Sequence, residues 1–199
     1  MQILTRSVLF ESNDARRSDF VLQVVVPGQN AALPALASHT TVPLATGERM
    51  FEATEFRDLL HGRGVGIIQP DCSHAGGISH MLTIARMAES YEVGFAPHCP
   101  LGPVALAACM QVNACAINFT LQETSMGIHY NAEEGGADLL DYLLDPSVLD
   151  VDADGCVARL DGPGLGVEID EEKVRAAAER GHDWRDREWR LMDGTPTTW

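Results

Sequence analysis

Residues 64–123 read GVGIIQPDCSHAGGISHMLTIARMAESYEVGFAPHCPLGPVALAACMQVNACAINFTLQE. Short apolar runs in this stretch and just before it each end on a titratable residue, namely Glu48, Asp71, His98 and Glu123. Consecutive members are separated by about 25 residues, the length that a short strand, a helix and two turns occupy in a repeated β/α unit. The pattern therefore predicts parallel strands that alternate with helices.

The predicted fold class is α/β, in the form of a partial (β/α) barrel. A complete eightfold barrel takes roughly 250 residues, and this sequence has 199. Barrel enzymes build their active sites at the carboxyl ends of the strands. We therefore expect the functional groups of this chain among the residues that end its apolar runs.

Three regions are expected along the chain: an unmatched segment over 1–19, the partial barrel over 20–135, and a C-terminal tail with short helices over 136–199. Within them we predict a strand over 20–26 and helices over 31–38, 52–61, 78–91, 104–116, 137–144 and 170–180.

Two of these predictions concern packing. Ile78, Met81, Leu82 and Ala85 follow the spacing of a core-facing helical stripe. The helix over 104–116 is apolar on nearly all sides, so it should be buried between the sheet and another layer. In the tail, Trp184, Trp189 and Trp199 suggest docking onto another surface.

Charge and cysteine content limit the classes of partner. The chain carries 14 Lys and Arg against 29 Asp and Glu, a formal net charge of −15, which argues against nucleic acid and anionic membranes as partners. Its five cysteines are odd in number and form no CxxC pair, which favours reduced thiols. No apolar run approaches the ~20 residues of a membrane span, and no targeting segment is visible. We expect a cytoplasmic protein.

Asp71 and His98 end strands that we expect to be neighbours in the sheet. Neighbouring strands lie about 4.8 Å apart, so the carboxylate can accept a hydrogen bond from the imidazole and make it a better base. This pair is a candidate general-base dyad. Glu123 could donate to a developing oxyanion if a raised pKa keeps it protonated. Glu48 is a hard oxygen ligand suited to Mg²⁺.

Other interpretations of these residues remain open. A carboxylate at the end of a strand is often a helix N-cap or a salt-bridge partner, although four titratable groups in register favour a site. A zinc site from Cys72, His74, His98 and Cys99 lacks a standard ligand spacing. A hydrolase triad with Ser73 or Ser125 lacks the GxSxG elbow. We expect His61 and His80 to face solvent.

Several longer motifs resemble the D-galactonate dehydratase branch of the mandelate racemase-like subgroup in the enolase superfamily. They cover nearly everything from about Asn30 to Trp199, and they read ATGERM (45–50), IIQPDCSHAGGI (67–78), APHCPLGPVALAAC (96–109), QETSMGIHYN (122–131), PGLGVEIDE (163–171) and DWRDREWR (183–190).

The resemblance implies Mg²⁺-dependent dehydration of a sugar acid to a 2-keto-3-deoxy acid. The metal holds the carboxylate of the substrate, a base removes the adjacent proton, and the 3-hydroxyl leaves with the help of an acid. By this resemblance His98 is the base, Asp71 its partner, Glu123 the group that stabilises the enediolate, and Glu48 the last of three metal-binding carboxylates.

The sequence departs from the family pattern near its start. Leu22 stands where the second metal carboxylate is expected, and residues 1–19 contain no Asp-x-His for the first ligand and the catalytic acid. The capping domain and the first barrel strands also have no counterpart. We therefore predict a poor or inactive dehydratase, the C-terminal part of a longer ancestor. The alternative is a non-catalytic chain, or one completed by a partner, either a second copy or a complementing chain.

Overall fold

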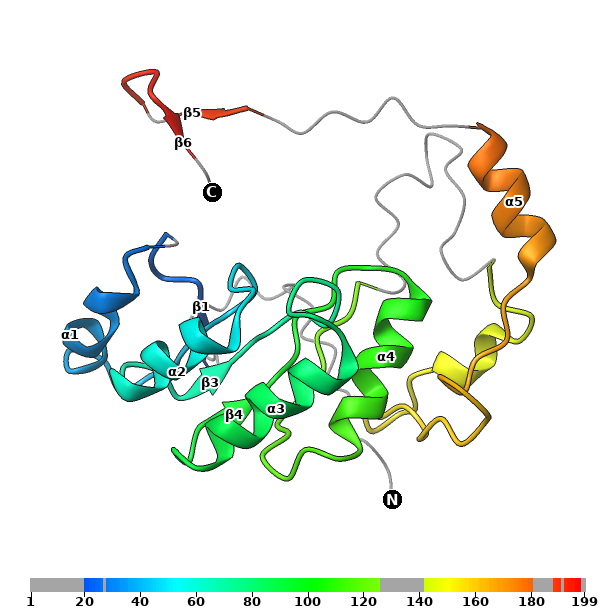
Figure 1. Cartoon of the computed structure of the whole chain (residues 1–199), viewed down its shortest axis with the longest axis horizontal. Helices are drawn as coiled ribbons and strands as arrows, with labels where there is room; N and C mark the ends of the chain where they lie inside the picture. Colours follow the sequence, from blue (N-terminus) through cyan, green and yellow to red (C-terminus); the bar gives the residue numbers. More distant parts are fainter. Residues whose placement is uncertain (1–19, 27, 126–141, 181–187, 191, 198–199) are drawn as a thin grey trace.

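The computed structural model describes residues 20–26, 28–125, 142–180, 188–190 and 192–197 (Figure 1). Its elements follow in the order β1 (Val21–Leu22), η1 (Asn30–Ala32), α1 (Leu33–Ala37), β2 (Leu44–Thr46), α2 (Ala53–His61), β3 (Ile67–Ile68), α3 (Ile78–Glu89), β4 (Gly94–Phe95), α4 (Pro103–Asn113), η3 (Pro146–Leu149), α5 (Glu171–Arg180), β5 (Trp189–Arg190) and β6 (Pro196–Thr197).

The first four strands form one parallel sheet in chain order, β1-β2-β3-β4, and β5 pairs with β6 in a separate antiparallel sheet. Beyond β4, Phe119 forms a parallel bridge with Phe95, and the Thr120 amide donates to the Phe95 carbonyl at 2.8 Å. A further parallel segment thus follows β4. Together with the helices between the strands, this arrangement confirms the predicted α/β partial barrel.

The two faces of the parallel sheet contact different residues, because successive side chains of a strand point to opposite sides. The face toward the helices carries the main core, which includes Leu44, Ile68 and Phe95. The other face carries a smaller cluster with Ala45, Ile67, Ala96 and Leu121, against which Phe20 and Leu22 pack.

Helices α2, α3 and α4 lie along one side of the strands, α3 between the other two (Figure 1). In α3, Met81 and Ala85 are fully buried and Leu82 is half-buried, as the predicted stripe requires. Ile78 is 40% exposed, so its predicted core position is wrong. It begins the helix at the rim of the sheet, where it lines a groove together with Val104 of α4.

The segment over 142–169 covers part of α4. The side-chain amide of Gln111 donates to the carbonyls of Leu160 and Leu165 at 3.2 and 3.0 Å. Leu143, Leu149, Val157 and Leu160 join the main core. The predicted burial of α4 between the sheet and another layer is confirmed for most of the helix, whereas Val104 in the first turn is 48% exposed and Cys115, near the end of the predicted range, is also exposed. The buried residues of α4 are Pro103, Leu106, Ala107, Cys109, Met110, Val112 and Asn113.

The predicted strand over 20–26 is shorter in the structure. It ends after Leu22, because Gln23 has a positive φ of 43°, a conformation that an extended strand does not contain. The side chain of Gln23 instead accepts a hydrogen bond from the Thr46 hydroxyl at 2.7 Å. Within the described part of the chain, β1 is an edge strand that pairs with β2 alone.

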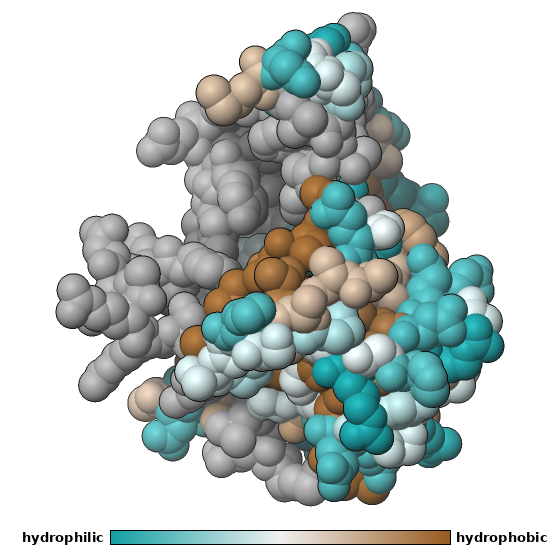
Figure 2. All heavy atoms as spheres, turned by 90° about the vertical axis from the view of Figure 1, so that its left-hand side faces the viewer, coloured by the Kyte–Doolittle hydropathy of each residue, from teal (hydrophilic) through white to brown (hydrophobic). Residues whose placement is uncertain are grey.

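The exposed side of β1 and the segment after it are apolar. Val21, Val24 and Val26 are 38%, 38% and 41% exposed. Figure 2 views the molecule from the side of α1 and β1, and it shows a band of hydrophobic residues on this face. A strand edge bordered by exposed valines is a surface that proteins usually cover.

Some predictions lie partly or wholly outside the described residues. The boundary at 135/136 and most of the helix over 137–144 belong to 126–141, and Trp184 and Trp199 are also outside. At the end of that predicted helix, Leu143 forms an antiparallel bridge with Ile169, so the helical prediction is wrong there. None of the described helices is both long and apolar enough to cross a membrane.

Gly47 offers a test of how tightly the backbone before Glu48 is packed. Its φ is 141°, and an added Cβ would lie 2.9 Å from both the Gln69 backbone nitrogen and Phe56 Cε1. We expect Gly47→Ala to lower the free energy of unfolding by about 2–4 kcal/mol, from backbone strain and overpacking combined. Urea denaturation measures this loss.

Gly28→Ala is the matched control, because Gly28 also has a positive φ of 86° but an added Cβ meets nothing within 4 Å. We expect it to cost only about 1 kcal/mol, the strain contribution alone. An equal loss of unfolding free energy in the two variants would contradict the close packing of Gly47 against Gln69 and Phe56.

Candidate active site

Backbone pairing at the ends of the strands brings three of the predicted residues together. Asp71 and His98 form a parallel bridge, and the His98 amide donates to the Pro70 carbonyl at 3.2 Å. The Glu123 amide donates to the Pro97 carbonyl at 3.3 Å. Asp71, His98 and Glu123 therefore follow three consecutive parallel segments at the same rim, as the spacing in the sequence predicts.

The predicted Asp71–His98 contact is present. His98 Nδ1 lies 2.8 Å from Asp71 Oδ2, and because an ionised carboxylate only accepts, Nδ1 carries the proton. The backbone amide of Ser73 donates to Asp71 Oδ1 at 2.7 Å. Both carboxylate oxygens are thus engaged, and the Asp71 side chain is only 2% exposed. The ring of His98 is held in one orientation.

The pKa values of the two partners move in opposite directions. Burial alone would raise the pKa of Asp71, but hydrogen bonds from His98 and the Ser73 amide, together with nearby histidines, bring it below its ordinary value of 3.8. Burial alone would lower the pKa of His98, but the hydrogen bond to Asp71 and the charges of Glu123, Glu48 and Asp71 raise it above 6.5. The dyad consists of an ionised carboxylate and a strengthened base.

Glu48 approaches the other side of the imidazole. Its Oε2 lies 3.4 Å from His98 Nε2, the nitrogen that Asp71 leaves free. The Glu48 side chain is 20% exposed, so it reaches both the dyad and solvent. Protonation of Nε2 would place a cation between two carboxylates.

Glu123 has the environment expected of a proton-bearing acid. Burial raises its pKa above 4.5, as do the charges of Glu48 and Asp71, against the opposing effects of His98 and the Cys99 amide. Glu123 Oε2 is buried and has no hydrogen-bond partner among the described residues. Such an atom is costly unless it carries a proton or meets a ligand.

The donor set does not fit a magnesium ion. Octahedral Mg²⁺ takes hard oxygen ligands, and Glu48 already contacts His98. Leu22 packs into the small apolar cluster with Ala45 and Ile67 rather than offering an oxygen. In the described ranges, no group of three or more His, Cys, Asp or Glu side chains could hold a metal ion. This also excludes the alternative zinc site among these residues.

Two further alternatives from the sequence fail in the structure. Among the described residues neither serine hydroxyl bonds a histidine, as a triad nucleophile would: the Ser125 hydroxyl donates to the Pro100 carbonyl at 2.7 Å, and Ser73 is exposed. His61 is exposed as predicted. His80 is half-buried, and its Nε2 accepts the Ala53 amide at 3.3 Å, so the prediction that it faces solvent is wrong.

His74 belongs to the site, although sequence reasoning considered it only as a zinc ligand. Its ring centroid lies 6.4 Å from that of His98 and 6.0 Å from that of Phe51. Its Nδ1 is 3.4 Å from the Glu48 carbonyl. The feature of the sequence that could have indicated this position is the turn of small residues after Asp71, which keeps His74 at the same rim of the sheet as Asp71 and His98.

The chain is similar to known proteins over most of its length. The sequence model of the enolase C-terminal domain-like family matches residues 23–173. The chain belongs to this family. The predicted kinship with D-galactonate dehydratases is confirmed by curated relatives that carry this name. The relative from Xanthomonas axonopodis pv. citri is 52% identical over 180 residues, covering 90% of this chain and 46% of the relative.

A second D-galactonate dehydratase, from Variovorax paradoxus, is 50% identical over 191 residues, which cover 96% of this chain and 49% of that relative. The chain thus spans about half the length of the curated relatives it matches.

Solved structures give the same family. A mandelate racemase/muconate lactonizing enzyme-type protein from Burkholderia SAR-1 matches with a TM-score of 0.73 and 30% identity over 90% of this chain and 43% of its own. An enolase from Agrobacterium radiobacter, solved with sodium and L-malate bound, matches with a TM-score of 0.71 and 32% identity over 89% of this chain and 45% of its own.

The raised pKa of His98 in this family member can be measured by NMR. The imidazole resonance that is lost in His98→Gln identifies His98 in the spectrum. In the unmodified chain we expect this resonance to titrate with a pKa above 6.5. Asp71→Asn should lower that pKa, because it removes both the strongest acceptor and a negative charge. Histidine ring resonances followed against pH give the value directly.

Asp58→Asn is the matched control for this titration. Asp58 is an exposed carboxylate paired with Arg57 at 2.8 Å, so its removal should leave the pKa of His98 unchanged. A His98 pKa that is at or below 6.5, or that does not respond to Asp71→Asn, would contradict the geometry of the dyad.

Proposed function

We propose that this chain carries the proton-abstracting half of a sugar-acid dehydratase site. The observation that supports this most directly is the His98 imidazole, held by Asp71 at 2.8 Å on one side and facing Glu48 at 3.4 Å on the other. The substrate class follows from the curated relatives, which are named D-galactonate dehydratases. D-galactonate is therefore our candidate substrate.

In this proposal the neutral Nε2 of His98 removes the proton next to the substrate carboxylate. Asp71 is the positioning residue, since it fixes the tautomer and stabilises the imidazolium that forms. The buried charge of Asp71 raises the affinity of His98 for the proton, so the base form is present at pH values above the raised pKa of His98. The rate of proton removal should rise with pH through that pKa.

Glu123 is proposed to stabilise the enediolate that results. Its raised pKa favours the protonated form, and its unpartnered Oε2 could donate a hydrogen bond to the oxyanion. Negative charge from Glu48 and Asp71 close by is a reason for Glu123 to stay protonated. Burial makes such a hydrogen bond stronger than it would be in water.

Dehydration also needs an acid that protonates the departing 3-hydroxyl, and magnesium where the family resemblance holds. Neither is accounted for by the residues that the structure describes. Leu22 offers no oxygen at the position where the resemblance expects a second metal carboxylate, and each 1.36 kcal/mol of lost stabilisation costs tenfold in rate. We therefore propose that the chain removes the proton more readily than it completes the elimination.

The second candidate is a non-catalytic chain, or one that a partner completes. It is favoured by β1, which among the described strands is an edge strand, bordered by the exposed side chains of Val21, Val24 and Val26. A second copy or a complementing chain could pair with this edge. In that case the His98 dyad would be a structural element of the isolated chain, without activity of its own.

Exchange of the C2 proton of D-galactonate in D₂O separates these proposals, because exchange requires the base but not the leaving-group acid. We expect slow deuterium incorporation in the presence of Mg²⁺, at a rate above that of 2-keto-3-deoxy product formation, both followed by NMR. Leu22→Glu should raise the exchange rate on the order of tenfold by adding a carboxylate ligand.

His98→Gln should abolish the exchange of the C2 proton both in the otherwise unmodified chain and in the Leu22→Glu variant. Val24→Glu adds the same carboxylate two residues further along, at an exposed side chain outside the small apolar cluster that Leu22 joins, and serves as the control that should not raise the rate. Exchange that survives His98→Gln would contradict the role of the base. No exchange in any variant, Leu22→Glu included, would favour the non-catalytic candidate.

A further inference from the structure

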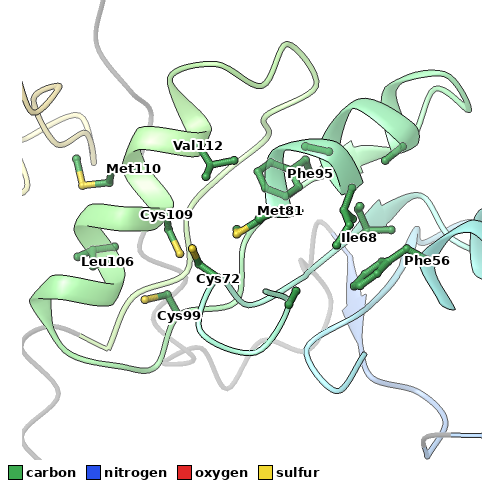
Figure 3. Close-up of a cluster of buried hydrophobic side chains, with 14 of the residues drawn as sticks. Phe56, Ile68, Cys72, Met81, Phe95, Cys99, Leu106, Cys109, Met110 and Val112 are labelled. Carbon is green, nitrogen blue, oxygen red and sulfur yellow. The ribbon is translucent and has the colours of Figure 1, made fainter. Parts of the chain in front are cut away.

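Three thiols gather directly behind the candidate active site. Cys72 follows Asp71 and Cys99 follows His98, so their side chains lie on the opposite side of the strand ends, toward α4. There they meet Cys109, and Figure 3 shows the three sulfurs close to one another within the main core. Cys72, Cys99 and Cys109 are only 5%, 1% and 1% exposed.

Cys109 is the central member of this thiol cluster. Its sulfur lies near those of Cys72 and Cys99 (Figure 3), and the interaction with these two thiols, together with burial, raises the pKa of Cys109. The neighbouring Cys109 thiol in turn lowers the pKa of Cys72, against burial and the charge of Asp71. Because the thiolate is the nucleophile, these opposite pKa shifts favour Cys72 over Cys109 as the thiol that attacks first.

Cys72 is also the thiol that a small molecule can reach. It lines a groove of about 760 Å³ between the first turns of α3 and α4, whose other walls include Gly76, Gly77, Pro103 and Val104. Cys99 and Cys109 do not line this groove. One thiol of the cluster therefore borders a groove that opens to solvent, while the neighbouring Cys109 lies behind it.

We infer that Cys72 and Cys109 form an oxidation-sensitive dithiol, which a hydroperoxide converts into a disulfide. The inference stands apart from the proposed activity, since it rests on the proximity of the two sulfurs in Figure 3, their burial and the groove at Cys72.

The reaction balances with a hydroperoxide as the only oxidant. The Cys72 thiolate attacks one peroxide oxygen, the O–O bond breaks, and Cys72 becomes a sulfenic acid while the leaving oxygen is released as water or an alcohol. The sulfur of Cys109 then attacks the sulfenic sulfur. The S–S bond forms, the S–O bond breaks, and the hydroxide leaves as water with the proton of Cys109. The two thiols supply both electrons.

The bond would join the turn after Asp71 to helix α4. In the reduced chain this turn is held by the Asp71 carbonyl, which accepts the His74 and Ala75 amides at 3.1 and 2.8 Å. A covalent tie one residue from Asp71 would restrain the carboxylate that orients His98. The thiol cluster thus couples the oxidation state to the position of Asp71.

Thiol counting after treatment of the whole chain with hydrogen peroxide tests the inference. Of five thiols, we expect two to be lost, measured with a thiol reagent after unfolding in denaturant, and both to return with dithiothreitol. Cleavage at methionine leaves Cys72 in residues 51–81 and Cys109 in residues 88–110. Mass spectrometry should find these two peptides joined by a disulfide. Because residues 88–110 also contain Cys99, fragmentation of the joined peptides in the mass spectrometer should place the link at Cys109.

Cys72→Ser and Cys109→Ala should each abolish this link, whereas Cys115→Ser is the control that should keep it, because Cys115 is exposed and outside the cluster. Circular dichroism checks the fold of each variant, and the link mapped in the unmodified chain does not depend on them. Loss of Cys115 alone, a link to Cys99 instead of Cys109, or stepwise oxidation to sulfinic acid without a disulfide would overturn the inference.

Discussion

The hydrogen bond between Asp71 and His98 is the interaction on which the rest of this site depends. It joins two neighbouring parallel strands at their carboxyl ends, 2.8 Å from nitrogen to oxygen, with almost no exposure of the carboxylate. A buried carboxylate is costly unless its oxygens are engaged, and here the Ser73 amide and His98 satisfy both of them. Without His98, Asp71 would be a buried charge with an unpaired oxygen. Without Asp71, His98 would face Glu48 with no fixed tautomer.

The same two strand ends serve the rim and the core at once. Asp71 and His98 face Glu48 and Glu123, whereas the next residues, Cys72 and Cys99, point back into the packing between the strands and α4. Neighbouring positions in the sequence therefore place acid and base chemistry on one side and thiols on the other. A change that moves Asp71 and His98 also displaces the thiols of Cys72 and Cys99, because the backbone that carries all four is fixed by the Asp71–His98 bridge.

Much of this arrangement could be predicted from the sequence because parallel strands share one direction. Apolar runs ending on Asp71, His98 and Glu123 must bring those ends to one rim once the strands pair. What failed depends on local backbone and tertiary contacts instead. Gln23 leaves the extended region and bonds Thr46, Ile78 starts its helix at the exposed rim of the sheet, and His80 meets the N-terminus of α2. Helical periodicity does not report where a helix begins relative to the core, nor which polar group a side chain will meet.

A double-mutant cycle of Asp71→Asn and His98→Gln tests the central interaction most directly. The contribution of Asp71, whose pKa is lowered, is present above pH 3.8 and is lost as pH falls through its folded value. The contribution of His98, whose pKa is raised, is present below pH 6.5 and is lost as pH rises through its folded value. Urea unfolding at about pH 5 should therefore give a coupling free energy of about 1–3 kcal/mol that declines toward alkaline pH. A coupling within about 0.5 kcal/mol of zero at every pH would contradict the account.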